Sequence, residues 1–182
     1  MSQAIARPDF VLIWGLSGAG KSRYCTWLVE RGYLYLDNDT IAQRINDGTA
    51  SRLERVWMAM RVEEVTTRDF AHAIAGQKVV AEFGARPDER SLVQLRLLID
   101  LGASVWWFDG DRSAARESWL DREVKVDGEF WRIQTEWVDS AWTRIAEILR
   151  SRILRTIGPG RTYLSEAQID RLMFGELADQ AE

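Results

Sequence analysis

The sequence of 182 residues is poor in cysteine and histidine, with one residue of each, Cys25 and His72. A single thiol cannot form an internal disulfide, and its presence suits a reducing compartment. One cysteine and one histidine also exclude a thiolate metal cage and a multi-histidine metal site. Disulfide-stapled scaffolds and zinc modules of these kinds are therefore not candidates for this chain.

Long apolar runs and a strong net charge are lacking as well. No run approaches the roughly 20 apolar residues that cross a bilayer, and residues 1–8 lack the hydrophobic stretch of a signal peptide. The formal net charge of -4, with 29% charged residues, is typical of an ordinary globular protein. We therefore expect a cytoplasmic protein that forms one domain over residues 1–182 with a single substantial core.

Short apolar runs alternate with segments of helical spacing along the chain. Strands are predicted at residues 10–14, 33–36, 79–83, 104–108 and about 152–157. Helices are predicted after residue 21, over about 51–73 as one or two helices, over 87–101 and 112–122, around 138–149, and after a capping box at Ser165 and Gln168. This alternation predicts an α/β fold with a parallel sheet of about five strands, helices on both faces, and ligands at the strands' carboxyl ends.

The segment directly after the first predicted strand matches the phosphate-loop pattern G-x-x-x-x-G-K-S: Gly15, Leu16, Ser17, Gly18, Ala19, Gly20, Lys21 and Ser22. Its glycines allow the backbone to curl so that several N–H groups face phosphate oxygens, assisted by the positive end of the following helix. Lys21 is expected to reach the β- and γ-phosphates, and the Ser22 hydroxyl to bind Mg²⁺. The alternative is an ordinary glycine-rich turn, which the flanking strand and helix disfavour.

Carboxylates follow the second and third predicted strands. Asp37 and Asp39 stand after the second strand, where Asp39 is the candidate general base for an attacking hydroxyl and Asp37 a candidate Mg²⁺ ligand. The alternative makes Asp39 the N-cap of a helix beginning near Ile41, and Asp37 a turn former. Glu82, at the end of the third strand, is a candidate metal-associated carboxylate or else a solvated strand-end residue.

Arginines are frequent over residues 112–132, which predict a lid. A guanidinium there can neutralise charge on a transferred phosphoryl group, and Arg116 and Arg122 are the candidates. The alternative is a solvated helix face in which Arg and Glu alternate.

In a fold of this kind the helices over about residues 41–76 are expected to cover the acceptor, and Trp57 on their apolar stripe is expected to be core.

The order of GLSGAGKS, YLYLDND, VVAEFGARPDER and WWFDGDRSAARESWLDRE resembles the small P-loop kinases, which include gluconate kinases, chloramphenicol phosphotransferase and the kinase domain of polynucleotide kinases. The resemblance covers nearly the whole chain and implies a P-loop NTPase three-layer sandwich with a short lid. It implies Asp39 as general base, Glu82 as the acid that ends the third strand, and Arg116 and Arg122 as lid arginines. It also implies ATP as the nucleotide, with adenine against the loop that begins at Gly158.

One position departs from the polynucleotide kinases, which place an arginine three residues after the base aspartate, where this chain has Ala42. Three functions stay open on the sequence. The first is ATP- and Mg²⁺-dependent phosphate transfer to a hydroxyl of a small metabolite, nucleoside or antibiotic. The second is a nucleic-acid kinase, which needs a basic groove leading to Asp39. The third is a nucleotide-binding regulatory NTPase.

Overall fold

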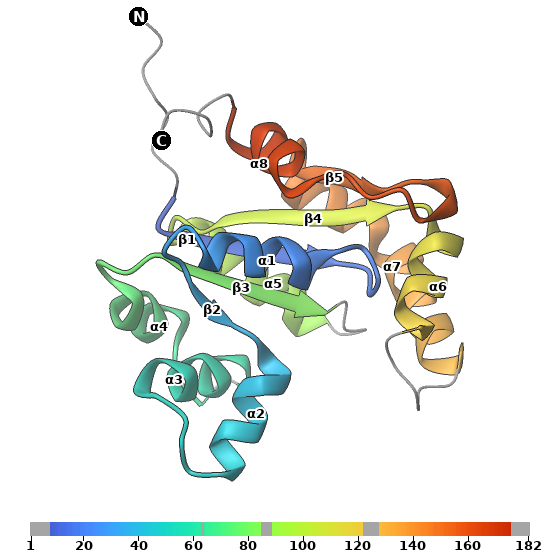
Figure 1. The fold of residues 1–182 in the computed structure, drawn as a ribbon. Helices are drawn as coiled ribbons and strands as arrows, with labels where there is room; N and C mark the ends of the chain where they lie inside the picture. Colours follow the sequence, from blue (N-terminus) through green and yellow to red (C-terminus); the bar gives the residue numbers. More distant parts are fainter. Residues whose placement is uncertain (1–7, 63, 85–88, 122–127, 176–182) are drawn as a thin grey trace, which may run out of the picture.

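The computed structural model describes residues 8–62, 64–84, 89–121 and 128–175. Its centre is a five-stranded sheet in the order β2-β3-β1-β4-β5, with every neighbouring pair parallel (Figure 1). The strands are β1 (Phe10–Gly15), β2 (Leu34–Leu36), β3 (Val79–Gly84), β4 (Ser104–Gly110) and β5 (Ile153–Ile157). The five predicted strands and their parallel arrangement are thus confirmed.

Helices complete a three-layer arrangement around this sheet. They are α1 (Lys21–Val29), α2 (Asn38–Asn46), α3 (Arg52–Arg61), α4 (Thr67–Ile74), α5 (Glu89–Asp100), α6 (Arg112–Leu120), α7 (Gly128–Leu149), the short 3-10 helix η1 (Pro159–Arg161) and α8 (Glu166–Phe174). Helices α1 and α8 cover one face of the sheet, and α5 and α7 cover the other (Figure 1). Helices α2, α3 and α4 stand together beside β2 and β3 (Figure 1).

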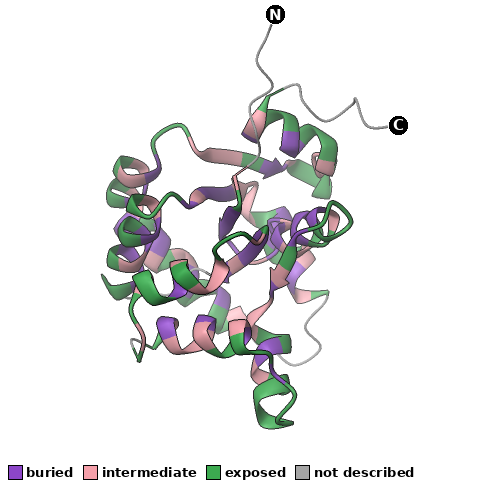
Figure 2. Ribbon diagram, turned by 90° about the vertical axis from the view of Figure 1, so that its left-hand side faces the viewer, coloured by how far each residue is buried: buried purple, intermediate pink, exposed green. Residues whose placement is uncertain are grey.

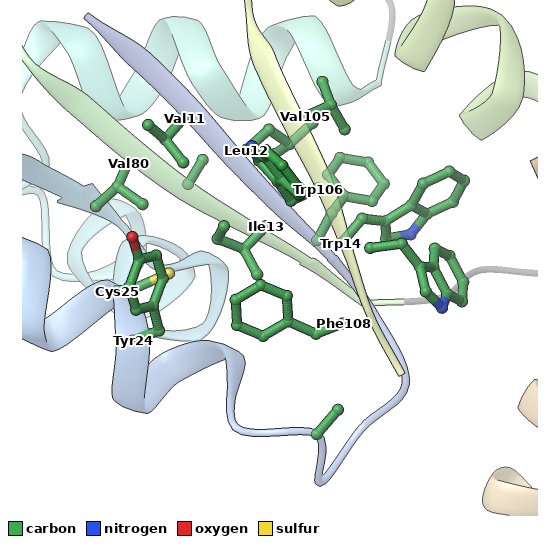
Figure 3. Close-up of a cluster of buried hydrophobic side chains, with 14 of the residues drawn as sticks. Val11, Leu12, Ile13, Trp14, Tyr24, Cys25, Val80, Val105, Trp106 and Phe108 are labelled. Atoms are coloured by element: carbon green, nitrogen blue, oxygen red, sulfur yellow. The ribbon is translucent and has the colours of Figure 1, made fainter. Parts of the chain in front are cut away.

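The core lies on both faces of the central strand, because all six residues of β1 are buried. On one face Phe108 packs against the ring of Tyr24 from α1, with the ring centroids 5.7 Å apart. On the other face Trp14 meets Trp107 of β4 at 5.1 Å and Trp137 of α7 at 6.1 Å. Figure 3 shows this cluster, and Figure 2 shows buried residues along the strands and the inward faces of the helices. The continuous apolar run of β1 therefore marks a strand covered on both sides.

Two helix boundaries differ from those expected, and residues 51–73 follow one of the two expected arrangements. Helix α7 begins at Gly128, ten residues before the predicted stretch, because its buried stripe starts earlier and includes the polar residue Gln134. Residues 51–73 form two helices, α3 and α4, each opened by its own capping box at Ser51 and Thr66. Helix α2 begins at Asn38 rather than near Ile41. In the described part of the chain, no helix combines the length and apolar character needed to cross a membrane.

Candidate functional site

The phosphate loop, residues 15–22, joins β1 to α1 at the carboxyl edge of the sheet (Figure 1). Its glycines sit where the backbone comes too close to its neighbours for any side chain. A Cβ on Gly15, whose φ is +135°, would lie 2.1 Å from the carbonyl oxygen of Phe108. A Cβ on Gly18, with φ +82°, would lie 1.9 Å from the carbonyl oxygen of Ala115 on α6. The loop is therefore packed directly against β4 and α6, and glycine is required at both positions.

Three side chains donate hydrogen bonds to backbone carbonyls of this loop: Lys21 Nζ to Leu16 at 2.9 Å, Tyr163 Oη to Gly18 at 2.7 Å, and Thr156 Oγ1 to Ala19 at 2.7 Å. In a planar trans peptide the C=O and the following N–H point in opposite directions. Two of the N–H groups that follow these carbonyls donate within the protein, that of Ser17 to Gln134 Oε1 at 3.1 Å and that of Ala19 to the carbonyl of Leu16 at 3.3 Å. An array of N–H groups at a helix N-terminus is suited to bind anionic oxygens.

Lys21 opens helix α1 and is buried, with 7% of its surface exposed. The first N–H groups of a helix have no acceptor within the helix itself, so the start of α1 offers them to a ligand. A buried ammonium group and a helix N-terminus together favour negative charge at this place. A buried lysine and the start of a helix therefore meet at the end of the phosphate loop, and phosphate binding by these residues stays a prediction.

The aspartates after β2 have different local roles. Asp37 is the N-cap of α2, where its carboxylate accepts hydrogen bonds from the N–H groups of Asp39 at 3.3 Å and Thr40 at 3.4 Å. The alternative in which Asp39 is the N-cap is wrong, because α2 begins at Asn38 and not near Ile41. Asp39 instead lies in the first helical turn with an exposed side chain. Its carboxylate thus stands at the carboxyl end of β2 without serving as the cap of α2.

Asn38, between these two aspartates, ties the start of α2 to its surroundings. Its Oδ1 accepts a hydrogen bond from the indole N–H of Trp57 at 2.8 Å, and its Nδ2 donates to the backbone carbonyl of Glu82 at 3.2 Å. Trp57 is fully buried, which confirms its predicted place in the core. One side chain therefore connects the start of α2, next to Asp39, to β3 at Glu82 and to α3 at Trp57.

Glu82 lies on β3 opposite Ile13 of β1 and is half-buried. Its Oε2 is buried and has no hydrogen-bond partner among the described residues. Burial raises the pKa of Tyr35, and the neighbouring Cys25 and Glu82 add to the rise. A half-buried carboxylate with one unsatisfied oxygen is not the solvated strand-end residue of the alternative interpretation.

Cys25 lies on α1, one helical turn after Lys21. Its thiol is completely buried, as expected of a small apolar residue. Burial raises its pKa well above the usual range, and the negative charge of Glu82 raises it further, whereas Lys21 lowers it. Asp37 acts on it more weakly in the same direction as Glu82. Lys21, Asp37 and Glu82 therefore all act electrostatically on this one buried thiol.

The predicted cation site next to the phosphate loop has three candidate oxygen donors. Ser22, Asp37 and Glu82 offer a hydroxyl and two carboxylates, and Oε2 of Glu82 has no partner among the described residues. Within the described ranges no group of three or more His, Cys, Asp or Glu side chains could hold a metal by itself. Oxygen donors that leave several positions for phosphates and water suit Mg²⁺. Ser22, Asp37 and Glu82 therefore have the donor chemistry that suits Mg²⁺, and their role as its ligands stays a prediction.

A second part of the site is a cavity of about 580 Å³ at the carboxyl end of β5. Its lining includes Asp111, Gly158, Pro159 and Thr162. Its size is within the range of small-molecule pockets, roughly 300–1,000 Å³. Next to it, Arg161 forms ion pairs with Glu117 and Asp121 of α6 and the turn that follows. The loop that begins at Gly158 thus borders a pocket and is connected to α6.

The structure describes only one of the two predicted lid arginines, Arg116. Arg116 is exposed on α6, and a Cβ on Gly128 would lie 2.9 Å from its Nη2, so the guanidinium reaches the start of α7. Arg122 lies outside the described residues. Their predicted role in phosphate transfer stays a prediction.

Sequence reasoning missed four side chains that shape this site: Asn38, Gln134, Thr156 and Tyr163. Gln134 of α7 accepts a hydrogen bond on Oε1 from the N–H of Ser17 at 3.1 Å, across 117 positions of sequence. No local motif distinguishes these residues from ordinary polar residues of a helix or strand end. A polar residue on the buried stripe of α7 is the one feature of the sequence that could have drawn attention to Gln134.

A solved structure of another protein shares the arrangement of strands and helices described above. A gluconokinase from Sinorhizobium meliloti 1021 superposes with a TM-score of 0.55 at 18% identity, over 92% of this chain and 90% of that one. The chain has the P-loop NTPase fold. A structure of the PezAT chromosomal toxin-antitoxin system of Streptococcus pneumoniae matches with a TM-score of 0.46 at 18% identity, over 96% of this chain and 82% of that one. The sequence of this P-loop protein matches no family model and no curated protein.

Proposed function

We propose that this P-loop protein is a kinase that uses ATP and Mg²⁺ and transfers the γ-phosphate to a hydroxyl group of a small metabolite, nucleoside or antibiotic. One observation carries the proposal. The phosphate loop follows β1, whose neighbour β3 carries the partly buried carboxylate of Glu82, and Asp39 follows β2, the next strand of the sheet. A plain nucleotide-binding module needs the loop, whereas phosphate transfer to an alcohol also needs a carboxylate next to the terminal phosphate.

The nucleotide would lie across the carboxyl edge of the sheet. The cavity beside Gly158 and Pro159 would take the adenine, and the phosphates would lie on the loop N–H groups and Lys21. Ser22, Asp37 and Glu82 would hold Mg²⁺, which when bound offsets the negative charge of the β- and γ-phosphates.

Asp39 would act as the general base. Its exposed carboxylate in the first turn of α2 is accessible to an incoming hydroxyl, from which it would accept the proton. Lys21 and the arginines 116 and 122 would offset the charge of the phosphoryl group during transfer. Phosphate transfer requires the attacking hydroxyl to be aligned with the phosphorus atom. The hydrogen bonds of Asn38 to Trp57 and Glu82 would hold the neighbouring base, Asp39, in position.

Helices α2, α3 and α4 would cover the acceptor. Part of the positive charge on this side is already matched within the protein. Arg44 pairs with Glu54, and Arg55 donates two hydrogen bonds to the carbonyl of Ala50. A nucleic-acid substrate would call for a continuous basic groove, so these pairings favour a small acceptor.

The test is transfer of radiolabel from γ-³²P-ATP in the presence of Mg²⁺ into sugars, nucleosides, antibiotics, and DNA and RNA with free 5′-hydroxyls. Asp39→Asn should keep nucleotide binding and abolish transfer, and Lys21→Ala should lose both. Label that enters sugars, nucleosides or antibiotics, and not with Asp39→Asn, supports the proposal and names the substrate class. Label that enters only DNA or RNA would favour a nucleic-acid kinase instead. Release of free phosphate at the same rate by wild type and Asp39→Asn, with no labelled acceptor, would refute it in favour of a regulatory NTPase.

A further inference from the structure

The cavity at the carboxyl end of β5 keeps few polar groups for a ligand. Its lining residues Asp111, Gly158, Thr162 and Leu164 all donate their backbone N–H groups to carbonyls of other lining residues. Pro159, which also lines the cavity, has no N–H group. A base bound in this cavity therefore finds no donor at these five backbone positions, and its recognition depends on side chains.

Both threonine hydroxyls of the lining are engaged as well. Thr156 donates to two backbone carbonyls, of which that of Ala19 lies at 2.7 Å. Thr162 donates to a carbonyl of its own loop at 3.1 Å. A hydroxyl has one hydrogen to donate, so neither threonine has a donor left. The remaining polar side chains of the lining are those of Asp111 and Arg155.

Asp111 is fixed in place and still has one carboxylate oxygen to offer. It is the N-cap of α6, where its Oδ1 accepts a hydrogen bond from the N–H of Ala114 at 2.8 Å. Its own N–H donates to the carbonyl of Ile157 at 2.8 Å. Among the described residues Oδ2 has no hydrogen-bond or ion-pair partner. An ionised carboxylate can only accept hydrogen bonds, so Asp111 offers the cavity an acceptor.

Arg155 offers the complementary donor. Its side chain is exposed, and in the described part of the chain it takes part in no hydrogen bond or ion pair, so it is not paired with Asp111. A guanidinium can only donate hydrogen bonds. Adenine carries a 6-amino donor directly beside ring-nitrogen acceptors. Its edge therefore matches a cavity that offers one carboxylate and one guanidinium.

We propose that Asp111 selects the base of the nucleotide. Its Oδ2 accepts a hydrogen bond from the 6-amino group of adenine, and Arg155 donates to a ring nitrogen beside that group. A base with no amino group at this place leaves the carboxylate without a donor. The inference rests on the proposed function, since it requires the base of ATP to occupy the cavity beside Gly158 and Pro159.

The test compares ATP with purine riboside 5′-triphosphate, which differs from ATP only by lacking the 6-amino group. Isothermal titration calorimetry with Mg²⁺ gives the dissociation constant of each nucleotide. Wild type should bind ATP about tenfold more tightly than the analogue, which is the effect of one hydrogen bond to a charged group. Equal affinities for the two nucleotides would overturn the inference.

Asp111→Asn removes the acceptor and keeps the cap of α6. Asn is a favoured N-cap, and its amide oxygen must face the N–H of Ala114, so its NH₂ group takes the place of Oδ2. We expect the Kd for ATP to rise about tenfold, and the Kd for the analogue to stay within about twofold. Equal losses for both nucleotides would contradict the assignment, since Asp111 would then act through the structure of α6. Thermal unfolding of the variant shows whether the fold is retained.

Arg155→Met separates the two contacts. It removes the donor to a ring nitrogen, which both nucleotides carry, so both Kd values should rise several-fold. A loss confined to ATP would contradict the role given to Arg155. Asp69→Asn is the matched control, because it makes the same chemical change in the first turn of α4 and should alter neither Kd.

The proposed function and this inference can fail separately. If wild type binds neither nucleotide and transfers no phosphate, both fall. If wild type phosphorylates an acceptor with ATP while Asp111→Asn binds ATP equally well, the inference alone falls. Tighter binding of GTP than of ATP, lost in Asp111→Asn, would also refute the adenine assignment, because the carboxylate would then accept from the amino group of guanine.

Discussion

The hydroxyl of Tyr163 donates a hydrogen bond to the backbone carbonyl of Gly18 at 2.7 Å, although 145 positions of sequence separate the two residues. The ring of Tyr163 lies against the same loop, since a Cβ on Gly20 would be 3.2 Å from its Cε1. Tyr163 follows η1, next to the residues that line the cavity at the end of β5. One segment therefore borders the proposed adenine pocket and also holds the phosphate loop.

This relationship predicts the effect of Tyr163→Phe. The variant keeps the ring and loses the hydroxyl, so the carbonyl of Gly18 loses its anchor and the loop is held less firmly. The loss of one hydrogen bond of about 1 kcal/mol should weaken nucleotide binding roughly fivefold. Calorimetric titration with ADP measures the dissociation constant of wild type and variant.

Tyr33→Phe is the control for this prediction, because the hydroxyl of Tyr33 donates to the carbonyl of Pro8 at 2.9 Å, at the amino end of the sheet. It should leave the Kd for ADP unchanged. Equal weakening by both substitutions would mean that a general loss of stability, rather than the phosphate loop, sets the affinity.

Asn38→Leu tests the hydrogen bonds by which Asn38 connects the start of α2 to β3 and α3. The variant has a similar volume but offers no partner to the indole N–H of Trp57 or to the carbonyl of Glu82. Leaving such buried groups unpaired should lower the free energy of unfolding by about 1–3 kcal/mol. Urea denaturation of Asn38→Leu, Trp57→Phe and the double variant gives the coupling. Strictly additive losses would show that the two side chains do not act together.

The fold could be predicted closely because its determinants are local. Buried parallel strands such as β1 appear as short apolar runs, and the capping box at Ser165 and Gln168 marks the start of α8 as predicted. The beginning of α7 could not be predicted so well, because the polar Gln134 interrupts the apolar spacing that defines a buried helix stripe. Its burial depends on a partner, Ser17, that is remote in the sequence.

The difference between local and remote determinants also explains which parts of the site could be predicted. The phosphate loop is contiguous, so its pattern alone predicts its geometry. Its supports come from Thr156, Tyr163 and Gln134, which lie 117 to 145 positions away and follow no local pattern. The alternative in which Asp39 caps α2 was wrong for a related reason. In the run Asp37-Asn38-Asp39 all three residues have side chains that favour the N-cap position, and only the backbone shows which one precedes the helix.

The two aspartates after β2 should respond differently to substitution. Asp37→Ala removes the side chain that accepts from the N–H groups of Asp39 and Thr40, and should cost about 1 kcal/mol of stability. Asp37→Asn keeps a good cap and should cost less. Asp39→Asn changes an exposed side chain and should stay within about 0.5 kcal/mol of wild type. Urea denaturation at neutral pH measures all three, and a larger loss for Asp39→Asn than for Asp37→Ala would contradict the cap assignment.

The buried thiol of Cys25 predicts a loss of stability at alkaline pH. Burial, reinforced by the charge of Glu82, raises its pKa well above the usual range in the folded state. The unfolded chain releases the thiol proton above about pH 8.5, whereas the folded protein retains it. The unfolded state then binds fewer protons, so the free energy of unfolding should fall as pH rises, by at most about 1.4 kcal/mol per pH unit from this group. Tyr35, whose pKa is also raised by burial, should add to the fall above about pH 10.

Urea denaturation between about pH 7.5 and 9.5 isolates the contribution of Cys25, because Tyr35 contributes little in either state over that window. Cys25→Ala should be less stable than wild type at neutral pH, since it loses a buried side-chain atom, yet its stability should change less with pH. The decisive quantity is the slope and not the absolute value. An equal slope in wild type and Cys25→Ala would show that another group releases the proton, and that the charges around the phosphate loop do not act on this thiol as the structure indicates.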